Sequence, residues 1–181
     1  RLVAGITHRG DVSDPVAIPR ANVAMGTRRL RIVDAAHGEQ PQASFDGKLL
    51  VSFNGEIYNH ARLRAELEQL GVPFRTQCDT EVLANALQVW GARALKRLAG
   101  MYAFVAFDVT TGAFLAARDP FGVKPLYLIQ DGTGFLFCSE IRPLRDAADR
   151  GEVMLLPPGY LLTRDLCTRF YTLTETSAFG P

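Results

Sequence analysis

Short apolar runs joined by glycine-containing turns are the main pattern along the chain, and they predict β-hairpins. Asp46-Gly47, Thr111-Gly112 and Asp131-Gly132 each separate two such runs, and tight turns favour glycine because they need positive φ angles. Direct hairpins make antiparallel pairs, which argues against a doubly wound parallel sheet. The predicted strand pairs, the last of them on a weaker signal, are 41–45 with 49–53, 103–108 with 114–118, 126–130 with 135–139, and 160–163 with 169–173.

Helical periodicity is concentrated between the first and the second hairpin. Leucines at helical spacing follow Asn59, and Gly71 ends that run. A second helix is predicted over 79–90, and a short third one carries Leu95 and Leu98.

One strand of the second hairpin is apolar at every position. Because residues 101–107 are apolar on both faces of a strand, both faces must be covered. Two stacked sheets with helices outside meet this requirement. We therefore predict an α+β fold, a four-layer αββα sandwich of two stacked antiparallel sheets, in a single domain that spans residues 1–181.

Composition and charge exclude several functional classes. The 181 residues are 48% hydrophobic and 22% charged, with a net charge of +1, so no basic surface for nucleic acid is indicated. The longest apolar run, 101–107, is far shorter than the roughly 20 residues of a membrane helix, and no signal peptide is evident. The three cysteines form no CxxC pair, so neither a disulfide framework nor a metal site is predicted. We expect a cytoplasmic protein without a membrane segment, and a homodimer stays open.

Three polar positions stand where a substrate could be bound. Asn54-Gly55 directly follows an apolar strand, and two adjacent N–H donors can form an oxyanion hole, although a simple turn is the alternative. Arg29 precedes another strand. It is either an ordinary surface residue or one whose guanidinium donates two parallel hydrogen bonds to a carboxylate. Asp79 is either a helix N-cap or a partner for an ammonium group. Together they fit an amino acid whose side chain carries a carbonyl.

Several longer motifs resemble one known family. Phe-Asn-Gly-Glu-Ile-Tyr-Asn (53–59), Cys-Asp-Thr-Glu-Val (78–82), Gly-Met-Tyr-Ala-Phe (100–104) and Arg-Asp-Pro-Phe-Gly-Val-Lys-Pro-Leu-Tyr (118–127) occur in the order that resembles the glutaminase domain of asparagine synthetases. The resemblance extends over almost the whole chain. It implies a class II glutamine amidotransferase domain with the N-terminal-nucleophile fold, which agrees with the predicted sandwich.

The resemblance also assigns roles to individual positions. It implies that Arg29 binds the α-carboxylate of glutamine and Asp79 its α-amino group. The Asn54 side chain and the Gly55 N–H form the oxyanion hole. It gives segment 118–127 a structural role in the wall of the site. The remaining glutamine-binding positions that it implies are Leu30, Ile32, Val33 and Glu56.

Two departures from the family pattern affect the expected activity. The family's nucleophile is a cysteine at the mature N-terminus, whereas this sequence begins with Arg1, so we expect the nucleophile and the first strand to be missing. No pyrophosphatase loop of the Ser-Gly-Gly-Leu-Asp-Ser type is present, so the synthetase domain is absent and ATP and magnesium are expected only there. The leading hypothesis is a glutamine-hydrolysing, ammonia-supplying domain that is inactive as given.

The alternative hypothesis is a degenerate domain that binds an amino acid or a protein partner without hydrolysing anything. The joint presence of Arg29, Asn54, Gly55 and Asp79 favours the enzyme, because a degenerate pocket has no reason to keep all four. The sequence does not specify the ammonia acceptor, which is aspartate or another carboxylate.

Overall fold

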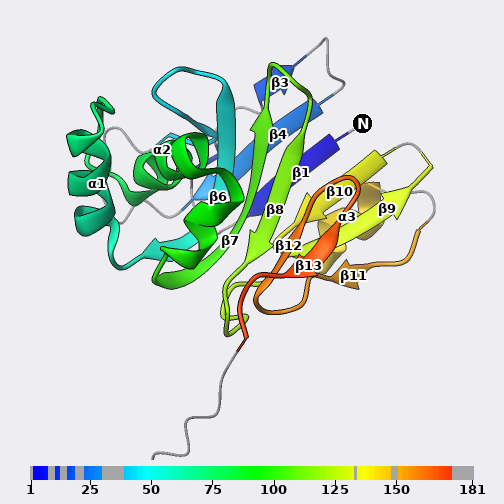
Figure 1. The fold of residues 1–181 in the computed structure, drawn as a ribbon. Helices are drawn as coiled ribbons and strands as arrows, with labels where there is room; N and C mark the ends of the chain where they lie inside the picture. Colours follow the sequence, from blue (N-terminus) through cyan, green and yellow to red (C-terminus); the bar gives the residue numbers. More distant parts are fainter. Residues whose placement is uncertain are drawn as a thin grey trace, which may run out of the picture.

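Two β-sheets stack face to face, with helices on both outer faces (Figure 1). The computed structural model describes residues 2–7, 11–12, 16–18, 23–29, 39–132, 134–147 and 151–172. Within these residues the order of layers is helices, six-stranded sheet, seven-stranded sheet, helix, which confirms the predicted four-layer α+β sandwich.

The six-stranded sheet is antiparallel throughout, with the order β13-β12-β8-β7-β6-β5. It contains three of the four predicted hairpins, in which β5 pairs with β6, β7 with β8, and β12 with β13, although β13 lies at 167–169 instead of the predicted 169–173. Its strands are β5 (Gln42–Ala43), β6 (Leu49–Ile57), β7 (Gly100–Asp108), β8 (Phe114–Arg118), β12 (Tyr160–Leu162) and β13 (Cys167–Arg169).

The seven-stranded sheet has the order β11-β9-β10-β1-β4-β2, with β3 also paired to β4. The fourth predicted hairpin, β9 with β10, lies in it. Its strands are β1 (Leu2–Thr7), β2 (Asp11–Val12), β3 (Val16–Ile18), β4 (Val23–Arg29), β9 (Tyr127–Asp131), β10 (Gly134–Cys138) and β11 (Met154–Leu155).

Strand β1 departs from the expectation in two ways. It pairs parallel with both β10 and β4, whereas the other pairs of this sheet are antiparallel. The opening segment, where we expected the first strand to be missing, therefore forms a strand inside the sheet. Parallel neighbours are joined by long connections rather than tight turns, so hairpin signals in the sequence could not have predicted this pairing.

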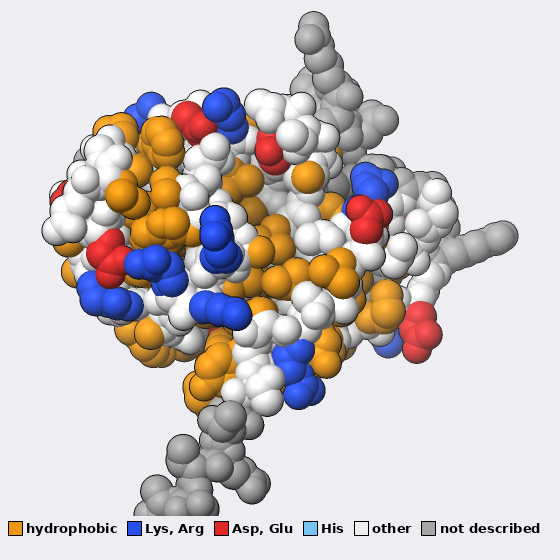
Figure 2. All heavy atoms as spheres, viewed as in Figure 1, with side chains coloured by type: hydrophobic (Ala, Val, Ile, Leu, Met, Phe, Trp, Pro, Cys, Tyr) orange, Lys and Arg blue, Asp and Glu red, His pale blue; other side chains and the backbone are white. Residues whose placement is uncertain are grey.

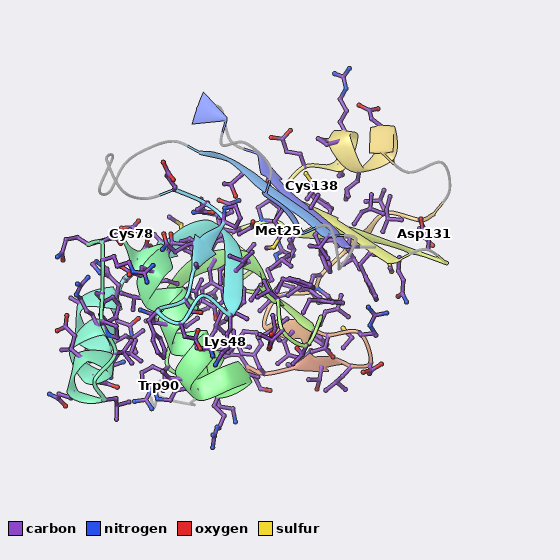
Figure 3. The ribbon with its side chains drawn as sticks, turned by 90° about the horizontal axis from the view of Figure 1, so that it is seen from above. Met25, Lys48, Cys78, Trp90, Asp131 and Cys138 are labelled. Atoms are coloured by element: carbon purple, nitrogen blue, oxygen red, sulfur yellow. The ribbon has the colours of Figure 1, made fainter. Side chains whose placement is uncertain are left out.

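Helices cover the outer face of each sheet, as Figure 3 shows from above. α1 (His60–Gln69), α2 (Asp79–Trp90) and the 3₁₀ helix η1 (Gly91–Lys96) match the three predicted helices, although η1 ends two residues before Leu98. The first two pack against the six-stranded sheet. α3 (Ile141–Ala147) packs on β9 and β10 through Leu144.

Strand β7 is buried on both faces, as its composition predicted. Tyr102, Phe104 and Ala106 belong to the core beneath the helices. Ala103 and Val105 belong to the core between the two sheets, as does Phe107.

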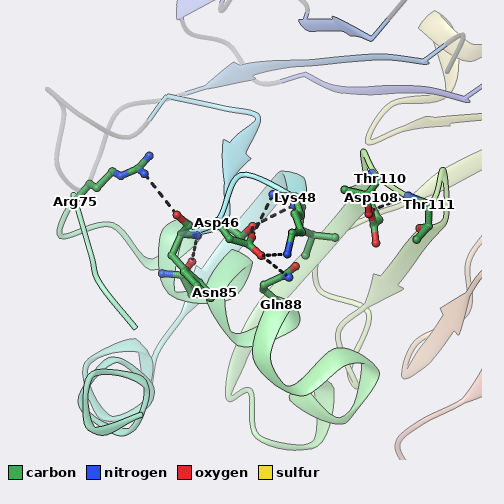
Figure 4. A network of polar contacts seen from close by, with 11 residues as sticks. Asp46, Lys48, Arg75, Asn85, Gln88, Asp108, Thr110 and Thr111 are labelled. Carbon is green, nitrogen blue, oxygen red and sulfur yellow. Dashed lines mark hydrogen bonds and ion pairs between the residues drawn. The ribbon is translucent and has the colours of Figure 1, made fainter. Parts of the chain in front are cut away.

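The hairpin turns are held by carboxylates at their first positions (Figure 4). Asp46 accepts hydrogen bonds from the Ser44 hydroxyl at 2.8 Å and from the Gln88 amide at 2.9 Å. At the next turn Asp108 accepts from the backbone N–H groups of Thr110 and Thr111. Asp side chains favour turns because they bond to the backbone that follows them. The glycines on which the prediction of these two turns rested, Gly47 and Gly112, have positive φ angles of 73° and 74°.

Tyr102 provides a test of the packing beneath the helices. Its hydroxyl is fully buried and has no hydrogen-bond partner in the described structure, and burial together with the charge of Asp119 raises the pKa of Tyr102. Because an unsatisfied buried polar group costs about 1–3 kcal/mol, Tyr102→Phe should leave the free energy of unfolding unchanged or raise it. Urea denaturation measures this change.

The control is Tyr102→Ala, which removes the ring as well and should lower the free energy of unfolding by about 3–5 kcal/mol. A loss of more than about 1 kcal/mol in Tyr102→Phe would show that the hydroxyl has a partner.

Candidate active site

The outer edge of β6 is the centre of the candidate site. Beyond Val51 this edge is not paired with β5, so side chains from elsewhere reach its backbone. The Phe53 N–H donates to Oε1 of Gln40 at 2.8 Å, and the Ile57 N–H donates to Oδ2 of Asp79 at 3.0 Å. Two N–H groups of one strand are thus held by two side chains from different elements.

The N–H of Gly55 points to the same edge, halfway between these two. Backbone groups of an antiparallel strand alternate between its two sides, so residues 53, 55 and 57 share one side. Tyr102, which lies opposite Gly55 in β7, agrees with this assignment. Its N–H and C=O bond with Asp119, at 3.3 and 2.7 Å, and therefore do not bond with Gly55. Gly55 therefore presents an N–H donor where the sequence analysis placed the oxyanion hole.

Only glycine fits at position 55. Its φ angle is +151°, and a Cβ there would lie 2.1 Å from the carbonyl oxygen of Met101. Asn54-Gly55 is inside β6, so the alternative interpretation of this dipeptide as a turn is wrong.

Asn54 and Glu56 flank this glycine. The Asn54 side chain is buried, and strand alternation places it on the face opposite to Phe53 and Ile57, which pack beneath the helices. Asn54 therefore faces the seven-stranded sheet. Glu56 is exposed.

Asp79 does not cap its helix. Cys78 is the N-cap residue of α2, and it makes no side-chain capping bond. Asp79 is the first helical residue, and its carboxylate bonds across to Ile57 in β6, so the capping alternative is wrong. Its Oδ1 lies 3.5 Å from the Thr80 hydroxyl, and an ionised carboxylate has about four acceptor sites. The group therefore has capacity for an ammonium ligand.

Gln40 is a residue of this site that the sequence analysis missed as a functional position. Its buried Oε1 accepts from the Thr27 hydroxyl at 3.2 Å as well as from Phe53, and its Nε2 donates to the Thr80 hydroxyl at 3.4 Å. One amide therefore joins β4, β6 and α2. The sequence analysis did not single out Gln40, because no periodic pattern signals a bridge between distant elements.

The structure does not describe the side chains of four residues that were predicted to bind glutamine. Arg29 is the last residue of β4, two positions after Thr27, and its side chain lies outside the described structure. Leu30, Ile32 and Val33 also lie outside the described residues. The structure thus brings together Asn54, Gly55, Glu56 and Asp79, and it places the end of β4 beside them through Gln40.

The described residues contain no cluster of three or more His, Cys, Asp or Glu side chains that could hold a metal ion.

Among the helices of the described chain, none has the length and hydrophobicity to cross a membrane. Within segment 118–127, the residues between β8 and β9 form a loop whose backbone is bonded by the buried side chains of Arg118 and Asp119. The role of this segment in the wall of the site stays a prediction.

The stacked sheets between helices match the fold of solved amidotransferases of the N-terminal-nucleophile class. Among solved structures, the glutamine phosphoribosylpyrophosphate amidotransferase of B. subtilis in complex with ADP and GMP matches 80% of this chain and 34% of its own, with a TM-score of 0.65 and 27% identity. A family model described as a glutamine amidotransferase domain matches residues 1–154. The chain belongs to this family.

Its relatives include glutamine-hydrolyzing asparagine synthetases. Asparagine synthetase 1 of Bacillus subtilis (strain 168) is 40% identical over 148 residues, which cover 82% of this chain and 23% of the relative. Asparagine synthetase 3 of Arabidopsis thaliana is 41% identical over 134 residues, which cover 74% of this chain and 22% of the relative. The chain therefore corresponds to the glutamine amidotransferase domain of asparagine-synthetase-like proteins and spans about a quarter of their length.

Substitution of Gln40 tests whether its amide holds the site together. Gln40→Leu removes the acceptor of the buried Phe53 N–H, which costs about 1–3 kcal/mol, and also removes the hydrogen bonds that Gln40 makes with Thr27 and Thr80. We expect the free energy of unfolding to fall by at least about 2 kcal/mol in urea denaturation.

The matched control is Gln42→Leu, two residues away. Its half-exposed amide donates only to the Ala43 carbonyl at 3.3 Å, so we expect a change within about 0.5 kcal/mol. Equal effects of the two substitutions would contradict the bridging role of Gln40.

Proposed function

We propose that this domain hydrolyses glutamine to glutamate and ammonia, and that the ammonia serves a synthetase part of a longer protein. The observation that carries the proposal is the edge of β6, where the Gly55 N–H lies between two N–H groups held by Gln40 and Asp79. Donors fixed before the reaction are what stabilise a developing oxyanion. The similarity to glutamine-hydrolyzing asparagine synthetases supports the same reaction.

Each end of the substrate has a proposed partner. The Asn54 amide and the Gly55 N–H bind the oxygen of the side-chain carbonyl of glutamine as it gains negative charge. The Asp79 carboxylate binds the α-amino group, and the Arg29 guanidinium binds the α-carboxylate as a two-pronged donor. The residues proposed to line the rest of the pocket are Leu30, Ile32, Val33 and Glu56.

The nucleophile that the resemblance implies is an N-terminal cysteine. Its thiolate attacks the amide carbon with its own α-amine as base, the C–N bond breaks, and ammonia leaves with the transferred proton. Water then hydrolyses the thioester to glutamate and restores the thiol. Cys78 is no substitute, because it has no free α-amine and is buried with its Sγ 2.9 Å from the Thr76 hydroxyl.

This reaction needs no cofactor in the domain itself. We assign ATP and magnesium to the synthetase part, which would activate a carboxylate of the acceptor for attack by ammonia. The acceptor is aspartate by analogy with the relatives, whose names state asparagine synthesis.

A polypeptide that consists of these 181 residues alone should not hydrolyse glutamine, because none of its three cysteines combines a thiol with a free α-amine. Glutamate release, compared with a heat-denatured sample, measures this. Turnover above that background would contradict the proposed mechanism. An N-terminal extension by natural sequence that supplies a mature N-terminal cysteine should restore activity.

Substitution of Arg29 tests the substrate clamp. If its guanidinium binds the α-carboxylate, it makes charge-assisted hydrogen bonds worth about 1.5–3 kcal/mol. Arg29→Ala should then weaken glutamine binding by about 10- to 100-fold, and Arg29→Lys should restore it only in part because an ammonium lacks the planar fork. Calorimetric titration measures the affinity, in an N-terminally extended domain whose cysteine nucleophile is replaced by alanine.

Arg28 is the internal control, because adjacent strand positions lie on opposite faces. Arg28→Ala should change the affinity by less than about twofold. The opposite result, with Arg28 essential and Arg29 dispensable, would place the clamp one residue earlier. Unchanged affinity in both variants would remove the amino-acid site from the proposal.

A further inference from the structure

The segment between α1 and α2 is tied to a buried carboxylate of α2. Glu81 is 2% exposed. Its Oε1 accepts a hydrogen bond from the Arg75 N–H at 2.8 Å, and its Oε2 accepts from the N–H and the hydroxyl of Thr76 at 2.8 and 2.7 Å. Because a buried carboxylate is tolerated only when it is well bonded, Glu81 and this segment hold each other in place.

The bonding continues from Thr76 to the residue before Asp79. The Cys78 N–H donates to the Thr76 hydroxyl oxygen at 3.2 Å, and the Sγ of Cys78 lies 2.9 Å from the same oxygen. Because the Thr76 hydroxyl donates its proton to Glu81, the Cys78 thiol is the donor in this contact. Through Thr76, Glu81 thus fixes both the backbone and the side chain of the residue that precedes Asp79.

This arrangement differs from the usual capping of a helix start. Glu81 is the third residue of α2, where a glutamate commonly accepts from the N–H of the N-cap residue. Here the N-cap N–H, that of Cys78, is bonded to the Thr76 hydroxyl, and Glu81 bonds to residues further back in the chain. The carboxylate therefore fixes the path by which the chain enters α2.

Arg64 of α1 holds the same segment from its other side. Its Nη1 donates to the Thr76 carbonyl oxygen at 2.6 Å, and its guanidinium lies 4.3 Å from the centre of the Phe74 ring. The N–H, the hydroxyl and the C=O of Thr76 are therefore all bonded. Bonding on every side leaves the chain before Asp79 little freedom to move.

Asp79 is the residue whose direction depends on this path. Its carboxylate reaches across to the Ile57 N–H in β6 instead of bonding within α2. A side chain occupies one of a few rotamers on its backbone, so the backbone at 78–79 determines where that carboxylate points. Asp79 is half-buried whereas Glu81 is buried, so a ligand can reach Asp79 but not Glu81.

We infer that Glu81 is a positioning residue for the α-amino site, an inference that rests on the proposed function. Glu81 does not touch the substrate. It holds the start of α2 so that the Asp79 carboxylate lies at the edge of β6 with acceptor capacity left for an ammonium group. Glu81 thereby determines how strongly the site distinguishes an amino acid from the same acid without its α-amino group.

Calorimetric titration of the full-length polypeptide that contains these residues tests this inference with two ligands that need no hydrolysis. Glutamate is the product of the proposed reaction, and glutarate is the same molecule without the α-amino group. We expect the unchanged protein to bind glutamate at least about tenfold more tightly than glutarate, the lower end of what a charge-assisted hydrogen bond contributes.

Glu81→Gln should reduce this preference to less than about threefold, because an amide offers one acceptor oxygen where the carboxylate offers two. The affinity for glutarate, which has no group for Asp79 to bind, should stay within about twofold. Equal weakening of both ligands would show a merely structural role and would overturn the inference. An unchanged preference for glutamate would overturn it as well.

The matched control is Glu66→Gln, the same chemical change on α1. In Figure 2 acidic and basic side chains lie together at the left of the molecule, where Figure 1 shows α1. The Glu66 carboxylate forms ion pairs with Arg62 and Arg97, and neither of these belongs to the segment before Asp79. We expect the preference for glutamate to stay within about twofold of its original value.

Substitutions of Thr76 test the path from Glu81 to Asp79, and they keep the inference testable should Glu81→Gln not fold. Thr76→Val removes the hydroxyl that bonds to Glu81 and Cys78, so the preference for glutamate should fall at least about threefold. Thr76→Ser keeps a hydroxyl and should retain the preference. The same preference in both variants would contradict the path.

Glutamine hydrolysis by the unchanged full-length protein separates this inference from the proposed function. Hydrolysis together with an unaltered preference in Glu81→Gln would leave the proposed function standing and overturn the inference. A preference for glutamate that Glu81→Gln removes, without any hydrolysis, would do the reverse. An unchanged protein with no preference for glutamate would overturn the inference, because it would have no α-amino site to position.

Discussion

The hydrogen bonds along the outer edge of β6 are the constraint on which the candidate site depends. An unpaired strand edge presents backbone donors that must find acceptors. Here β5 ends early, and the side chains of Gln40 and Asp79 take the donors of Phe53 and Ile57. Among the described residues no strand pairs with the stretch of this edge that contains Gly55, since β5 pairs no further than Val51. A site built this way needs neither a mobile loop nor a cavity in the core to offer a directed N–H.

Close approach of two strands fixes the same edge from the other side. Gly55 lies against the backbone of Met101, and Gly100 lies against the carbonyl of Glu56, each at a distance that would put a Cβ 2.1 Å from an oxygen. Side chains at these positions would push β6 and β7 apart. The glycines therefore serve packing as well as donor exposure.

Local signals in the sequence predicted most of the fold but little of the bonding that assembles the site. The turns at Gly47 and Gly112 were predictable because a tight turn needs a positive φ angle, which each glycine adopts, and nearby Asp carboxylates bond to residues within a few positions. The leucine repeat and Gly91 predicted two helices for the same reason. The bridge through Gln40 joins residues 13 and 40 positions apart, and Asp79 bonds to a residue 22 positions away instead of to its own helix. Such contacts follow from the three-dimensional packing and have no periodic trace in the sequence.

Asp119 connects the loop after β8 with the candidate site through its backbone hydrogen bonds, and their geometry indicates whether the loop can move. Oδ1 holds the N–H groups of Phe121 and Val123, whereas Oδ2 holds those of Tyr102 and Lys124. A switch would require an element with two alternative arrangements that a partner could bias. A buried carboxylate with four backbone donors offers one arrangement, since any other would leave buried polar groups unpaired. The loop is therefore a rigid support for the strand next to Gly55 rather than an element that transmits a conformational signal to it.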